Sequence, residues 1–98
     1  MNSIQSLRGE QQTMLDKASS LKEEANRLHV SAANYSANGV PDRADADEKL
    51  ALIREVESNS FEKKAEEIEQ SIVKLQTQAD QIQRQIDELQ SQRDQIIG

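Results

Sequence analysis

The sequence predicts an all-α protein built as an antiparallel helical hairpin of two long coiled-coil helices. Three observations predict this fold: the composition, the spacing of the apolar residues, and a single helix-breaking segment. Charged residues make up 31% of the 98 residues and aromatic residues 2%, and the mean hydropathy is -0.83. Such a chain has little material for a globular core and has the composition of long helices. We therefore expect residues 1–98 to form one coiled-coil unit.

The first helix is predicted over residues 3–37. Apolar and small residues, with the polar Gln11 as an exception, recur there in alternating steps of three and four from Ile4 to Tyr35. This is the spacing of a helix face that packs on a partner helix. Position a of three successive heptads holds alanine, and small side chains let two helix backbones approach closely. The residues predicted to pack within the hairpin are Ala18, Leu21, Ala25, Leu28 and Ala32.

A turn is predicted over residues 38–43. Asn38 and Gly39 can adopt a positive φ, which ends a helix, and Pro41 cannot continue one. Asp42 is then the predicted N-cap of the next helix. A short turn between long helices folds them back on each other, so residue i of the first helix is predicted to face a residue near roughly 81 minus i.

The second helix is predicted over residues 44–97. Its apolar seam is expected to drift at the start, because Ile53, Glu57 and Phe61 are spaced by steps of four. An extra step of four is a stutter, which relaxes a supercoil locally. From Phe61 onward the heptad spacing is regular. The residues predicted to pack against the first helix are Ile53, Phe61, Ile68 and Leu75.

The second helix is longer than the first, and we predict an overhang from about residue 79 that is about 30 Å long. Its apolar stripe needs a partner, and the predicted oligomer interface is Ile82, Ile86, Leu89 and Ile96. The flanking e and g positions from Gln76 to Gln92 all hold glutamine, so charge does not choose an orientation. Arg93, at an a position, fits an antiparallel pair better than a parallel one. We expect a homo-oligomer, with a two-fold dimer forming an elongated helical bundle favoured over higher orders.

Charge and hydropathy exclude some partners. Residues 44–70 carry nine acids and four bases, which repel phosphate groups and disfavour binding to nucleic acid or to an anionic membrane surface. No apolar stretch approaches the roughly 20 residues that span a bilayer. We expect a soluble, intracellular protein, and a basic protein would be the electrostatic complement of the acidic stretch.

The sequence predicts no catalytic, cofactor-binding or metal-binding residues, and hence a protein that is not an enzyme. His29 is the single histidine, the chain has no cysteine, and His29 is expected to be solvated at the hairpin edge. The acids between Asp42 and Glu48 are explained by helix capping and the helix dipole rather than by a calcium loop. No phosphate-binding loop or nucleophile motif is present.

Two functional hypotheses follow. The first is a non-enzymatic, oligomeric coiled-coil protein that serves as a structural, adaptor or scaffolding element through protein–protein interaction. The alternative is a small acidic chaperone or regulatory protein that captures another helical or basic protein through its C-terminal helix or its acidic stretch. The uncovered stripe motivates both hypotheses, and the net charge of residues 44–70 motivates the second.

Overall fold

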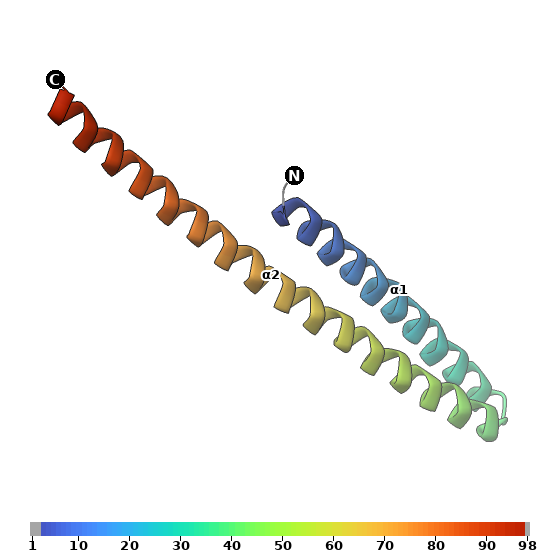
Figure 1. Cartoon of the computed structure of the whole chain (residues 1–98). Coiled ribbons are helices and arrows are strands. Elements are labelled where there is room, and N and C mark those ends of the chain that lie inside the picture. The colour runs from blue at the N-terminus through green and yellow to red at the C-terminus, as the bar shows by residue number, and fades with distance from the viewer. Residues whose placement is uncertain (1–2, 98) are drawn as a thin grey trace.

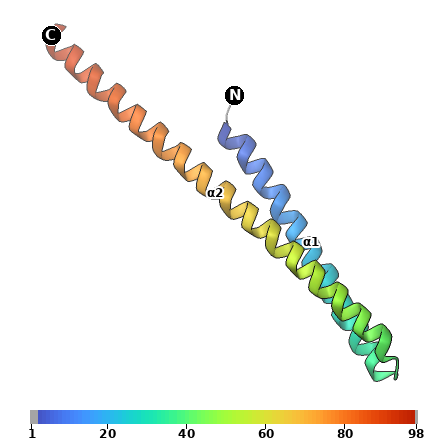
Figure 2. The same cartoon turned by 60° about the horizontal axis from the view of Figure 1, so that its bottom comes forward.

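The computed structural model describes residues 3–97, which form two helices joined by a tight turn (Figure 1). Helix α1 spans Ser3–Ala37 and helix α2 spans Pro41–Ile97. The two helices lie side by side with antiparallel chain directions, and α2 continues well past the start of α1 (Figures 1 and 2). The molecule is a rod with principal extents of 88 × 17 × 14 Å. The predicted all-α, two-helix hairpin is confirmed.

The C-terminus of α1 is closed by a glycine turn. Gly39 has a φ of +76°, the left-handed conformation that glycine adopts without strain. Its backbone N–H donates to the carbonyl of Ser36 at 3.2 Å, and the N–H of Val40 donates to the carbonyl of Tyr35 at 2.9 Å. This pair of hydrogen bonds is a Schellman motif, which satisfies the last carbonyls of the helix.

Helix α2 begins at Pro41, three residues earlier than the predicted start at residue 44. Proline is tolerated in the first turn of a helix, because its missing N–H would have no partner there and its φ is already helical. The N–H of Ala44 donates to the carbonyl of Val40 at 3.2 Å, so Val40 takes the N-cap position. The prediction that Asp42 caps the helix was wrong: Asp42 lies inside the first turn, where its charge faces the positive end of the helix dipole.

The seam between the helices is made mostly of small residues. In α2 the buried positions recur every seven residues without a break, and they are Ala44, Ala51, Ser58, Ala65 and Ile72. In α1 the buried residues are Ala18, Ala25 and Ala32. The Ser58 hydroxyl is fully buried and donates to the backbone carbonyl of Ala18 at 2.9 Å. A side chain as short as serine reaches the opposite backbone only where two helices approach closely.

The expected stutter is absent, and this changes the position of Ile53. The buried residues of α2 keep one heptad spacing from Ala44 to Ile72. Residue numbers joined across the hairpin sum to between 76, for Ala18 with Ser58, and 84, for Lys22 with Glu62, so the predicted sum of about 81 holds to within a few residues. Ile53, predicted in the seam, is 52% exposed on the outer side of α2. The prediction failed because it assigned the seam to large apolar residues, whereas close packing selects alanine and serine.

Candidate interaction surface at the C-terminal overhang

The overhang comprises residues 76–97 of α2, beyond the part that α1 covers and about three residues longer than predicted. All twenty-two of these residues are exposed, and no other helix of the described chain lies beside the overhang in either view (Figures 1 and 2). At the rise of an α-helix they extend about 33 Å. The overhang is thus a single helix with both its polar and its apolar faces open to solvent.

One apolar stripe runs along the overhang. The exposed fractions are 57% for Ile82, 41% for Ile86, 64% for Leu89 and 85% for Ile96. These four residues, the overhang stripe, continue the three-and-four spacing of Ile68, Ile72 and Leu75 in the hairpin. Ile72 is fully buried against α1, whereas Ile82, ten residues later, has no cover. The helix face that packs inside the hairpin therefore emerges as an open surface.

Amides rather than charges border the overhang stripe. Its flanking positions are glutamines, of which Gln83 donates from Nε2 to Oδ1 of Asp87 at 3.0 Å. Arg93 lies on the stripe between Leu89 and Ile96, and its Nη2 is 3.4 Å from Oδ1 of Asp94. The Arg93 side chain is 62% exposed. The surface therefore carries one charged interruption in an otherwise apolar and amide-lined face.

The remaining residues predicted for hairpin packing lie along the contact between α1 and α2. Leu21, Leu28, Phe61, Ile68 and Leu75 are all partly exposed and flank the buried small residues. Two amines cover the Phe61 ring, with Lys17 Nζ at 5.5 Å and Lys64 Nζ at 5.2 Å from its centroid. These larger side chains form the rim of the seam, and the alanines form its centre.

A second apolar surface, missed in the sequence, lies on the outer side of α2. Leu52, Ile53 and Val56 are each more than half exposed and line a shallow apolar hollow together with Glu57. We call Leu52, Ile53 and Val56 the outer patch. A strict heptad counted from Ala44 places all three residues on the far side of the helix from α1. Counting heptads from Ala44 could therefore have located the outer patch from the sequence.

The structure also gives His29 two partners that the sequence did not predict. Its Nδ1 lies 3.0 Å from Oε2 of Glu48, and its Nε2 lies 2.6 Å from Oε1 of Glu55. These hydrogen bonds raise the pKa of His29 above its ordinary value, and the bond to Glu55 contributes more than the bond to Glu48. A protonated ring donates from both nitrogens, so the three residues form a clasp between α1 and α2. We call this group the His29 clasp.

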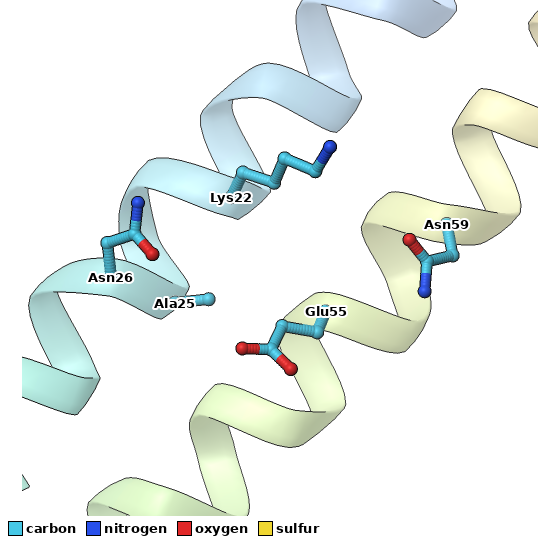
Figure 3. Close-up of a pocket in the computed structure, with 5 residues that line it drawn as sticks. All are labelled: Lys22, Ala25, Asn26, Glu55 and Asn59. Carbon is cyan, nitrogen blue, oxygen red and sulfur yellow. The ribbon is translucent and has the colours of Figure 1, made fainter.

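A groove between the helices adjoins the His29 clasp. Figure 3 shows Lys22, Ala25 and Asn26 of α1 facing Glu55 and Asn59 of α2 across it. The charged groups are engaged in links between the helices, because Lys22 pairs with Glu62 at 2.6 Å and Glu55 accepts from His29. We therefore interpret this groove as a gap between side chains of α1 and α2, within the contact that holds the hairpin together.

Neither a metal cluster nor a spanning helix is found in the part of the chain that the structure describes. Among residues 3–97, no three His, Cys, Asp or Glu side chains are grouped so as to hold a metal ion. None of the helices described combines the length and apolar character needed to cross a membrane. Comparisons with protein-family models, curated proteins and solved structures gave no match. The overhang stripe is an exposed continuation of the helix face that is buried in the hairpin.

Proposed function

We propose that this chain is a structural coiled-coil protein that self-associates through its overhang and serves as a scaffolding or adaptor element. One observation carries the proposal: the apolar face that is buried in the hairpin continues in the same spacing into the exposed overhang. Ile72 and Ile82 belong to the same helix face, and only the first is covered within one chain. A second copy presents the same face and can cover it.

The energetics support a partner for the overhang. Burying an isoleucine or leucine side chain contributes about 1.5 to 3 kcal/mol before the cost of ordering is subtracted. An isolated helix of this length is marginally stable in water, and an uncovered apolar stripe is a poor surface for a monomer. Two copies that pair stripe to stripe stabilise both overhangs at once, which a self-complementary two-fold contact achieves with one sequence.

The shape of the molecule supports a scaffolding role. One chain is 88 Å long but only 17 Å wide, so it separates features at its two ends better than it encloses a ligand. Joining two chains by their overhangs would leave both hairpins free, each with its outer patch of Leu52, Ile53 and Val56 exposed. The assembly would be a longer rod that presents two equivalent hairpin surfaces.

Light scattering on the purified chain tests this proposal. The parent chain and Ser91→Asp should both show twice the chain mass of 11.0 kDa. Ile86→Asp should show a single chain, because it places a charge in the middle of the overhang stripe. Ser91 is exposed on the opposite face of the same helix, so Ser91→Asp is the matched control.

Circular dichroism on the same samples checks that Ile86→Asp keeps a helical hairpin. An Ile86→Asp chain that retained the parent's oligomeric mass would overturn the assignment of the interface. A monomeric parent chain would favour the alternative function, capture of a helix from another protein. The uncharged glutamine borders support that alternative, because they would accept an amphipathic helix in either orientation.

A further inference from the structure

We infer that the partner of the overhang is a second copy in an antiparallel, two-fold arrangement, with Ile86 facing the partner's Leu89 and Ile82 facing the partner's Arg93. This inference rests on the self-association proposed above and adds its orientation and register. Two features of the described residues lead to it, the place of Arg93 on the stripe and the place where α1 begins, and the glutamines that flank the stripe are compatible with it.

Arg93 argues against a parallel pair. It occupies a stripe position between Leu89 and Ile96. In a parallel pair in register, it would face the partner's Arg93 inside an apolar contact, where two like charges both lose solvation and repel each other. In the antiparallel arrangement the two arginines lie about 16 Å apart along the helix. Each then borders an isoleucine, with a side chain long enough to reach solvent.

Helix α1 fixes how far the two overhangs can overlap. In the proposed register Ala79 faces the partner's Ile96, and all four residues of the overhang stripe are covered. A shift of one heptad toward the hairpin would press the partner's Ile96 onto Ile72, which α1 already buries completely. A shift of one heptad the other way would leave Ile82 facing no residue of the described helix. The proposed register is therefore the deepest overlap that α1 permits.

The flanking glutamines fit this arrangement. Antiparallel pairing brings Gln83 beside the partner's Gln90 and Gln85 beside the partner's Gln92. An amide group both donates and accepts hydrogen bonds, so identical side chains can bond to each other without a complementary charge. Charged residues of the overhang other than Arg93 lie outside these flanking positions, namely Asp80, Arg84, Asp87, Glu88 and Asp94. Nothing at the edge of the stripe repels an identical antiparallel copy.

Single-cysteine variants test the orientation directly, because the chain contains no cysteine of its own. We would prepare Ala79→Cys and Ile96→Cys, which face each other in the proposed register and leave Arg93 in place, and treat each alone, and the two mixed, with a short bis-maleimide cross-linker. The inference predicts covalent dimers in the mixture that contain one chain of each kind, identified by intact mass. Each variant alone should remain largely uncross-linked. Ser91→Cys, on the outer face, is the negative control in every sample.

Each outcome separates orientation from self-association. Cross-linking of each variant with itself, and not between the two, would show a parallel pair and overturn the inference. An oligomeric mass by light scattering without the mixed product would overturn the register. Both results would leave the proposed function standing. A monomeric mass for the parent chain would instead remove the proposed function, and the inference with it.

Discussion

The two halves of α2 use the same helix face in different ways. In the hairpin the face is mostly small, with Ala51, Ser58 and Ala65 buried against α1. In the overhang it is large, with isoleucine and leucine exposed. Small residues permit a close contact in which a serine hydroxyl reaches the opposite backbone, whereas branched apolar residues suit helices at the usual separation of about 8 to 10 Å.

This difference shows where one chain buries its own apolar face and where it leaves that face exposed. The transition lies around Ile68, Ile72 and Leu75, where the face is already large but α1 still covers it. Beyond that point the spacing continues and the cover does not. A change of residue size along one heptad pattern therefore separates a contact that is complete within the chain from a face that the chain leaves exposed.

The largest expected effect on stability comes from placing a large side chain, like those of the overhang stripe, in the small-residue seam of the hairpin. Ala51→Leu inserts a large side chain at a position with no exposed surface. Because the neighbouring backbone cannot withdraw without losing the contact, we expect the free energy of unfolding to fall by about 1 to 3 kcal/mol. Urea unfolding followed by circular dichroism measures this change.

Ala33→Leu is the control for that experiment, because Ala33 is exposed on α1. It adds the same atoms outside the seam and should change the free energy of unfolding by less than about 0.5 kcal/mol. Equal stabilities for the two variants would mean that the helices are not closely packed at Ala51. The contrast between the two halves of α2 would then lose its physical basis.

Periodicity predicted the helices and the buried alanines of α1, because alternating steps of three and four leave little choice of face. The turn was predicted from Asn38, Gly39 and Pro41. The start of α2 was less predictable. There the large residues Leu52, Ile53 and Val56 lie on the outer side, and counting apolar residues led to Ile53 as a seam position. A rule that weights hydrophobicity cannot find a seam that is selected for small volume.

Counting large apolar residues placed Ile53 wrongly, but the same count located the overhang stripe. The overhang stripe consists of large residues in a regular heptad, so its position follows from the sequence and the length of the helix. The His29 clasp depends on which residues face each other across the hairpin. The predicted pairing placed His29 opposite a residue near 52. Its partners Glu48 and Glu55 lie on either side of that position, so the pairing rule did not single them out.

A smaller effect is expected at the one polar residue buried in the seam. Ser58→Ala removes the hydrogen bond to the Ala18 carbonyl but keeps the side chain small. We expect the free energy of unfolding to fall by about 0.5 to 1.5 kcal/mol, the usual contribution of one such bond. Ser60→Ala, at an exposed position of α2, is the control. A Ser58→Ala chain as stable as its parent would show that seam volume, and not this bond, sets the contact.

The smallest effect concerns pH and belongs to the hairpin alone. The pKa of His29 is raised in the folded chain from its ordinary value of 6.5 by the carboxylates of Glu55 and Glu48. A raised pKa means that the folded state holds the proton more tightly than the unfolded state. The stabilisation is therefore complete below about pH 6.5 and is lost as the pH rises through the folded pKa.

We expect the urea midpoint of the parent chain to fall as the pH rises from about 6 to 9, and His29→Gln to lack this component. Because the His29 clasp is open to solvent, added salt should weaken the slope. Unfolding of both chains at several pH values, with and without salt, measures the difference. Both chains are made in the Ile86→Asp background, which we expect to be monomeric, so that dissociation of the overhangs does not contribute. An identical slope in the parent and His29→Gln would mean that the clasp does not hold the helices together in solution, and that the alanine seam alone distinguishes the hairpin from the overhang.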